Sequence, residues 1–192
     1  MKLTRLLWLL AILSLGGCAA APRHDTIDQH EVAGLAHAIL ALGEGIDPEE
    51  ARRAAQIAYG HSRQLAREYQ ITDPPLIHNT KVNMGLRPRG LCYHWSEDIE
   101  ARLLQEDFRT LDMHRAIAPA RLLQIEHSTA IISRKGDSLF EGLILDPWRT
   151  GGELFWTPVR DDTGYNWRPR DEVLDQRRQT VTERRQSPAL LP

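Results

Sequence analysis

The sequence predicts an α+β domain in which N-terminal helices and a core helix pack on a small antiparallel sheet. Amphipathic segments with helix-capping residues fill the first half of the chain, and β-branched segments separated by turn residues fill much of the second half. Hydrophobic residues make up 42% of the chain, an ordinary proportion for a globular protein, so the chain can bury a real core as one domain.

The N-terminus has the features of an export signal. Two basic residues precede a nearly unbroken apolar run, residues 6–15. This run is too short to cross a bilayer, because a spanning helix needs about 20 apolar residues. Glycines come directly before Cys18 and fit the pocket of a signal peptidase. We therefore expect residues 1–17 to be a secretory signal peptide.

The cysteine at this cleavage position makes the region resemble a bacterial lipobox. That resemblance implies cleavage before Cys18, lipidation of its sulfur and acylation, for example by palmitate, of the new N-terminus. Several acyl chains hold a protein on a bilayer firmly, since each buried CH2 contributes roughly 0.8 kcal/mol. Ala19 follows, with no aspartate there, and by analogy with lipoprotein sorting this favours the outer membrane, facing the periplasm, over the inner membrane. The alternative is an ordinary signal peptide with a chance cysteine.

The charge of the processed chain argues against nucleic acid as a partner. Removal of residues 1–17 takes away the positive charges of Lys2 and Arg5, so the formal net charge moves from −2 to −4. The sequence has no second long apolar segment, so the lipid on Cys18 is the only predicted anchor to the lipid bilayer. We expect residues 18–25 to be a tether.

Three helices are predicted from their start signals and apolar periodicity. Thr26 and Gln29 match a capping box, and Asp47 followed by Pro48 combines a cap with a proline at the first helical position. The third helix opens near Cys92, after a stretch with no helical pattern, residues 76–91. The expected helices cover residues 26–42, 47–69 and 92–108.

The second half of the chain reads as strands and turns. Charged and glycine-containing turns are expected at residues 134–137 and 150–152, and residues 116–119 read as a connection or a short strand. The chain is charged and weakly patterned from about residue 170. The expected strands cover residues 122–133, 139–145 and 153–159, within a domain of residues 26–170 that is followed by a polar tail, residues 171–192.

Cys92 is the first candidate for chemistry. The chain has two cysteines, and lipidation of Cys18 leaves Cys92 without an intramolecular partner. A free thiol in an oxidising compartment is a liability unless it is buried or has a task. The N–H groups and partial positive charge at a helix N-terminus favour a thiolate at this position. The alternative is a buried, inert cysteine that packs as a small hydrophobic residue.

The predicted hairpin brings a histidine and an aspartate together. With Lys135-Gly136 as a two-residue loop, His127 faces Ile144, and Asp146 is its diagonal neighbour on the same face of the sheet. Diagonal neighbours lie within reach of long side chains. A carboxylate there can hold the imidazole N–H and select its tautomer. The alternatives are a half-buried sheet histidine and an aspartate that only starts a turn.

The order Cys92, His127, Asp146 resembles the transglutaminase-like branch of the papain-like cysteine peptidases. In that family the nucleophilic cysteine opens a core helix, and the histidine and aspartate follow on neighbouring strands. The resemblance covers residues 76–160. The sequence departs from the papain pattern because no glutamine lies between Ile71 and Leu91 to serve the oxyanion hole. Asn83 is a substitute, and the backbone N–H of Cys92 is another donor.

The resemblance implies acyl transfer by a thiol hydrolase, thiol protease or transamidase that needs no cofactor. Cys92 attacks a carbonyl group, His127 handles the proton and Asp146 orients His127. Export makes peptides, proteins or peptidoglycan the candidate substrates, and His94 and Trp148 are predicted to line the cleft.

Two rival interpretations remain open. A zinc site would use Cys92, His94, His114 or His127, but the sequence has no C-x-x-C or H-E-x-x-H motif. The other rival is a catalytically inactive module that keeps the papain-like fold and binds an envelope protein or peptide.

Overall fold

The computed structural model describes residues 27–122 and 124–186. The predicted signal peptide, the whole predicted tether of residues 18–25 with Cys18, and Thr26 lie outside these residues. Across the described part of the chain, no helix is both long enough and apolar enough to cross a bilayer.

The strands form one five-stranded antiparallel sheet. Its order is β4-β3-β2-β1-β5, so β1, β2 and β3 are the central strands, and β4 and β5 form the edges. The short 3-10 helices η1 and η2 follow β2 and β4, at Leu139–Glu141 and Val159–Asp161. The strands are β1 (Leu111–Ala118), β2 (His127–Arg134), β3 (Leu143–Asp146), β4 (Phe155–Pro158) and β5 (Arg168–Pro169).

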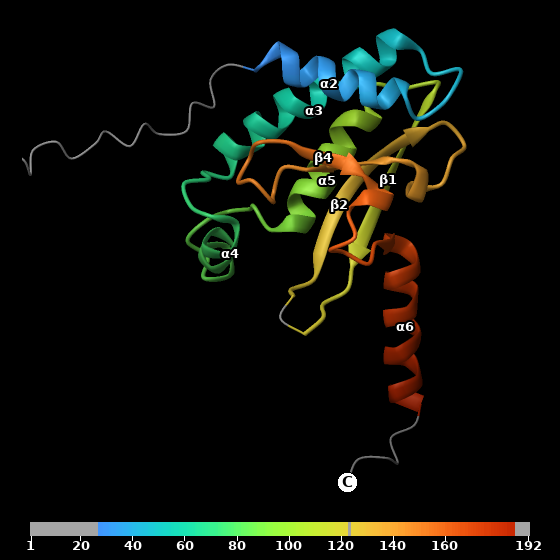
Figure 1. Cartoon of the computed structure of the whole chain (residues 1–192). Coiled ribbons are helices and arrows are strands. Elements are labelled where there is room, and N and C mark those ends of the chain that lie inside the picture. Colours follow the sequence, from blue (N-terminus) through green and yellow to red (C-terminus); the bar gives the residue numbers. More distant parts are fainter. Residues whose placement is uncertain (1–26, 123, 187–192) are drawn as a thin grey trace, which may run out of the picture.

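Three helices, α2, α3 and α5, form layers on one face of this sheet. Helix α5 packs on β1 and β2, α3 packs on α5, and α2 packs on α3. Helix α6 leaves the sheet beside the end of β1 and projects away from the rest of the domain (Figure 1). The mixed α+β class predicted from the sequence is confirmed. The helices are α2 (Gln29–Leu40), α3 (Pro48–Glu68), α4 (Pro75–Asn83), α5 (Cys92–Leu104) and α6 (Arg170–Gln186).

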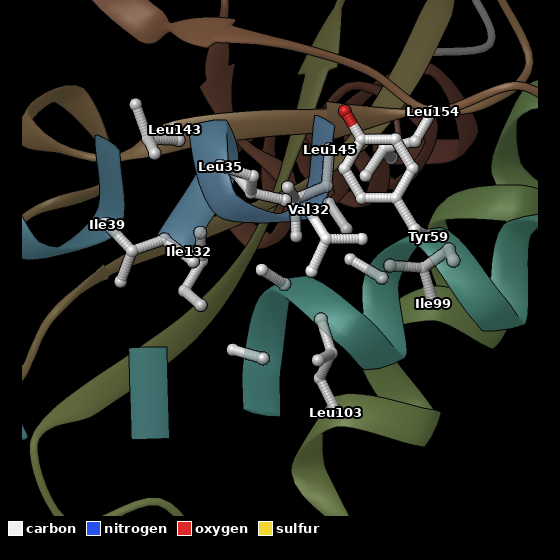
Figure 2. Close-up of a cluster of buried hydrophobic side chains, with 14 of the residues drawn as sticks. Val32, Leu35, Ile39, Tyr59, Ile99, Leu103, Ile132, Leu143, Leu145 and Leu154 are labelled. Carbon is white, nitrogen blue, oxygen red and sulfur yellow. The ribbon is translucent and has the colours of Figure 1, made fainter. Parts of the chain in front are cut away.

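The larger hydrophobic core lies between the sheet and the helices. Figure 2 shows side chains from α2, α3 and α5 meeting the inner face of β2 and β3, with Leu35, Ile99 and Ile132 fully buried among them. A second, smaller core lies on the opposite face of the sheet, where Ile131, Ile144 and Trp167 are buried. Because both faces are covered, β2 is buried along nearly its whole length. The two cores hold the start of β2 in a fixed place.

The helix predictions are confirmed at both ends of α3 and at the start of α5, and they are wrong at the start of α2, at α4 and at the end of α5. Asp47 caps α3 with Pro48 at its first position, and α5 begins at Cys92, as predicted. Helix α2 begins at Gln29 with Asp28 as its cap, because the Asp28 carboxylate accepts the His30 N–H. The predicted irregular stretch at residues 76–91 contains α4, which uses Pro75 as its first residue. Helix α5 ends at Leu104, before the predicted residue 108.

The strand predictions miss one central strand. The structure extends the predicted connection at residues 116–119 backwards into β1, an eight-residue strand paired with β2 along its length. Strand β2 begins at His127, later than the predicted residue 122, because the preceding residues form the connection from β1. The predicted tail contains α6, whose outer surface is charged and exposed.

The register between β2 and β3 differs from the predicted one by four residues. Ile144 faces Ile131, whereas the predicted two-residue loop placed it opposite His127. The turn at Arg134–Asp137 is present, since Asp137 N–H donates to the Arg134 carbonyl at 3.0 Å, but η1 then lengthens the connection. Because four is an even number, every side chain stays on the face predicted for it. His127 and Asp146 therefore still share one face.

Candidate active site

Cys92 is the first residue of the helix that crosses the sheet. Leu91 is the N-cap of α5, so the Cys92 N–H has no partner within the helix. The side chain is half-buried, and its Sγ lies 4.0 Å from the carbonyl oxygen of Glu126, the residue before His127. The starts of α5 and β2 therefore meet at one end of the sheet.

His94 holds the loop that leads into Cys92. Its Nδ1 accepts hydrogen bonds from the backbone N–H groups of Gly90 and Leu91, each at 3.2 Å. Burial, helped by the nearby charge of Arg89, lowers the pKa of His94 and keeps Nδ1 free to accept. The prediction that His94 lines the cleft is wrong, because its ring is buried beneath the loop and acts as a cap for α5.

Gly90 is required by the close approach of this loop to α4. Its φ of +122° lies in a region that favours glycine, and a Cβ there would overlap the His78 imidazole. His78 Nε2 lies 2.9 Å from the Arg89 carbonyl oxygen, and Trp95 Nε1 donates to the Gly90 carbonyl at 3.0 Å. These contacts fix the backbone immediately before Cys92.

The predicted contact between His127 and Asp146 is present. His127 Nε2 lies 2.5 Å from Asp146 Oδ2, and the two residues are 0% and 2% exposed. At this burial an unpaired charge would be strongly destabilising, so the two groups require each other. The hydrogen bond to Nε2 leaves the second ring nitrogen, Nδ1, for any other partner of the imidazole.

Cys92 is the other group that acts on this imidazole, since it adds to the effect of Asp146 on the pKa of His127. Nδ1 itself is buried and has no hydrogen-bond partner among residues 27–122 and 124–186. Burial by itself would lower the pKa of His127, but Asp146 and Cys92 outweigh that effect and raise the pKa to about 9. The imidazole is therefore protonated at neutral pH.

Arg149 extends the pair into a buried charge network. Its Nε donates to Asp146 Oδ2 at 2.9 Å, and its Nη2 donates to Asp162 Oδ2 at 2.8 Å. Trp167 Nε1 donates to the same Asp162 oxygen at 2.9 Å. Sequence reasoning missed Arg149 and Asp162. The only available signal was the position of Arg149 three residues after Asp146, within one turn.

Aromatic side chains enclose the imidazole. The ring centroids of Trp148, Tyr165 and Trp167 lie 4.6, 5.0 and 5.5 Å from that of His127. Trp148 was predicted to line the cleft. It is buried against His127 instead, because its ring completes the apolar cover over the histidine. The aromatic cover excludes water from the His127–Asp146 pair and strengthens their interaction.

Asn83 does not reach the site. It is exposed at the end of α4, so the prediction that it substitutes for an oxyanion residue or lines the cleft is wrong. The asparagine that touches this region is Asn79, one turn earlier, whose Oδ1 accepts from Trp148 Nε1 at 3.0 Å. Because α4 was not predicted, Asn79 could not be distinguished from Asn83 by sequence analysis.

A cleft of about 370 Å³ opens beside the sulfur. It lies between the first turns of α5, the inner face of β1 and β2, and the first turns of α6. Cys92 is therefore reached from the helix-covered face of the sheet, while His127 is buried behind it. The lining residues are Cys92, Tyr93, Glu97, Arg115, Ile117, Glu126, Ser128, Arg170, Leu174 and Arg177.

The residues of the rival zinc interpretation are dispersed. His94 caps α5, and His114 Nε2 contacts the Ser133 hydroxyl at 2.8 Å, in the middle of the sheet. Within residues 27–122 and 124–186, no three histidine, cysteine or acidic side chains are grouped as metal ligands.

No protein-family model, curated protein or solved structure matches the chain.

Proposed function

We propose that the chain is an envelope lipoprotein, anchored to a membrane through Cys18, whose domain performs acyl transfer with Cys92, His127 and Asp146. The observation that carries this proposal is the buried hydrogen bond between His127 and Asp146, with Cys92 Sγ 4.0 Å from the carbonyl oxygen of the residue before His127. A nucleophile, a base and an orienting carboxylate in this relation are the requirements of thiol catalysis.

The topology supports a transglutaminase-like core. A helix that begins with the cysteine packs on an antiparallel sheet, and the histidine and aspartate belong to its adjacent strands β2 and β3. The chain order of the three residues is the one in that family. The family assignment is part of the proposal and supplies its expected reaction class, hydrolysis or transamidation.

In the acylation step, the Cys92 thiolate forms a bond to the carbonyl carbon of the substrate, and the carbonyl π electrons move to the oxygen. The backbone N–H of Cys92 faces no partner in its own helix and is a donor for that oxyanion. The tetrahedral intermediate then collapses, and the amine or alcohol leaves with the proton from Nδ1 of His127. The product is a thioester on Cys92.

In the deacylation step, neutral His127 takes a proton from water or from an acceptor amine. The oxygen or nitrogen bonds to the carbonyl carbon, the C–S bond breaks, and the thiolate and imidazolium are restored. Asp146 is held in place by Arg149 and keeps its hydrogen bond to Nε2, which orients the imidazole and leaves Nδ1 for the proton transfer. Peptides, proteins or peptidoglycan peptides of the envelope are the candidate substrates.

The reactivity of Cys92 tests this proposal. A free cysteine has a pKa of about 8.5 and reacts mainly as the thiolate, so an inert thiol is alkylated slowly below pH 8. We expect iodoacetamide to alkylate Cys92 readily at pH 6–7 and His127→Ala to slow the reaction roughly tenfold, because the paired imidazolium is lost. The measurement is the rate of modification of the Cys92 peptide by mass spectrometry.

The control for this experiment is His114→Ala, which removes a half-buried histidine of the same sheet that does not contact Cys92. His127→Gln is a second variant that preserves more of the side-chain volume, and circular dichroism checks that each variant is folded. A Cys92 that reacts only after the chain is unfolded would contradict the enzyme proposal.

That outcome would favour a catalytically inactive module that binds an envelope protein or peptide. The complete burial of His127 favours this alternative, since the imidazole is not among the residues that line the cleft.

The lipid anchor has a separate test. Cys18→Ser removes the sulfur that would carry the diacylglycerol, so we expect the chain to move from the membrane pellet to the soluble fraction of the envelope. Cys92→Ser is the matched control and leaves the fractionation unchanged. An equal amount of wild-type and Cys18→Ser chain in the pellet would exclude the lipidation.

A further inference from the structure

The cleft beside Cys92 contains a buried arginine whose hydrogen-bonding capacity is incompletely used. The Arg115 side chain is 10% exposed and extends from the inner face of β1 to the first turn of α5. Its Nη2 donates to the Tyr93 carbonyl at 3.3 Å and to the Ser96 hydroxyl at 3.1 Å. Its Nε is buried and has no hydrogen-bond partner in the described part of the chain.

The nearest acidic group does not neutralise this guanidinium fully. Glu100 Oε2 lies 3.9 Å from Arg115 Nε, beyond the range of a hydrogen bond. Burial raises the pKa of Glu100 in spite of the opposing charges of Arg115 and Arg170. Because Glu100 does not accept a hydrogen bond from Nε, Arg115 can interact with a second negative charge.

A second arginine stands beside the first. Arg170, at the start of α6, lines the cleft with Arg115, and both also line an adjoining cavity of about 240 Å³. Burial, with repulsion from Arg170, lowers the pKa of Arg115 although Glu100 opposes the shift. Two guanidinium groups that repel each other at the wall of one cleft are stabilised when an anion binds between them.

The acids that line the cleft are directed elsewhere. Glu126 is paired with Arg177 of α6, and exposed Glu97 lies 3.8 Å from Arg89. Arg170 is paired with exposed Asp171 at 2.9 Å, and an exposed pair of this kind contributes little. Arg115 and Arg170 are therefore the cations of the cleft that no acid lining the cleft neutralises.

We propose that Arg115 and Arg170 form a carboxylate-binding subsite of the Cys92 cleft. Arg115 contacts the first turn of the helix that Cys92 opens, so a carboxylate on this subsite places a neighbouring carbonyl group near Sγ. The preferred substrates are then short peptides with a free carboxylate close to the bond that is attacked. This inference deepens the proposed function and rests on it.

A pair of alkylating reagents tests the subsite directly. Iodoacetate carries the carboxylate and iodoacetamide is its neutral counterpart, and both report on the same sulfur. The quantity to measure is the alkylation rate of Cys92 with iodoacetate divided by its rate with iodoacetamide. The same ratio in the denatured chain is the reference. Because an activated thiol reacts faster with both reagents, a difference between the two ratios reports only the attraction of the anion. We expect folding to raise the ratio about tenfold, which corresponds to about 1.4 kcal/mol.

The variants separate charge from packing. Arg115→Gln should return the ratio to near its denatured value, Arg115→Lys should retain part of it because the charge remains, and Arg170→Gln should lower it less. Arg178→Gln is the matched control, since Arg178 is on α6 outside the cleft and is 68% exposed. An unchanged ratio in folded Arg115→Gln would overturn the subsite.

The same measurement distinguishes this inference from the proposed function. The absolute iodoacetamide rate and its dependence on His127 report on the thiol, whereas the ratio reports on the arginines. If the ratio depends on Arg115 but the iodoacetamide rate does not change in His127→Ala, the carboxylate subsite is supported and the proposed enzyme is not.

Peptides that slow the alkylation of Cys92 by iodoacetamide identify the source of the carboxylate. Protection by acetyl-Ala-Ala, but not by its C-terminal amide, assigns the subsite to a peptide C-terminus. Protection by acetyl-Glu-amide assigns it to an acidic side chain. Both results support a carboxylate subsite.

Discussion

Replacement of Asp146 by alanine is expected to lower the free energy of unfolding by about 3–5 kcal/mol, because it leaves two charged groups without their shared partner. The Asp146 carboxylate accepts from His127 at 2.5 Å and from Arg149 at 2.9 Å, and it is itself 2% exposed. Water cannot replace the carboxylate in a pocket closed by aromatic rings. Urea denaturation at pH 7 measures the loss.

A double-mutant cycle identifies the cause of this loss. Arg149→Met removes the second buried charge, so Asp146→Ala should be less destabilising in the Arg149→Met background than in the wild type. Asp175→Ala is the control, because Asp175 is 57% exposed on α6 and its surface ion pair contributes little. If Asp146→Ala costs no more than Asp175→Ala, the buried network is not formed in solution.

Asp146→Ala should also slow alkylation of Cys92, since the histidine loses the group that holds Nε2. Asp146→Asn keeps the shape and one acceptor, so its effects on stability and on reactivity should both be smaller. A variant that loses stability but keeps full Cys92 reactivity would assign Asp146 a structural role only.

The contact between His127 and Asp146 could be predicted from the sequence even though the predicted register was wrong. The true connection between β2 and β3 contains η1, which no turn signal indicated, and it moves the partner of Ile144 by four residues. Alternation along a strand preserves the face under any even shift, so the prediction of a shared face survived. A shift by three or five residues would have placed the two groups on opposite faces.

The missed elements have local causes. Residues 76–91 were predicted to be irregular, but Pro75 provides the first residue of α4, where its missing N–H is harmless. In β1, Asp112, His114 and Arg115 interrupt the apolar alternation, because they serve the hairpin turn, a serine and the cleft. When polar residues of a strand have partners elsewhere in the fold, the alternation of apolar and polar residues is lost, and the strand cannot be predicted from that pattern.

The surroundings of the site depend on contacts between distant segments. His94 was read as a cleft residue because it is next to the nucleophile in sequence, yet helical geometry turns its ring back onto the loop. Arg149 and Asp162 are thirteen residues apart and meet only because the chain after β4 returns to the site. Such partners become visible only when the sheet is assembled.

Stability is expected to fall as the pH rises from about 6.5 to 10, and His127 is the cause. Its pKa is raised to about 9 in the folded chain, whereas an exposed histidine has a pKa of about 6.5. The folded state therefore binds the His127 proton more tightly than the unfolded state does. The resulting contribution to the free energy of unfolding is fully present below pH 6.5 and is lost as the pH passes through 9. The shift corresponds to about 3 kcal/mol.

The comparison with His127→Gln isolates this contribution. The difference in unfolding free energy between wild type and His127→Gln, measured by urea denaturation from pH 6 to pH 10, should shrink by about 3 kcal/mol over that range. Cys92→Ser removes the sulfur that helps to raise the pKa of His127, so the decline should begin at a lower pH in that variant. Asp146, Arg149 and Asp162 remain in place in all these chains. A difference that stays constant with pH would show that the imidazole is neutral in the folded protein, and the thiolate–imidazolium pair of the proposed mechanism would then be absent.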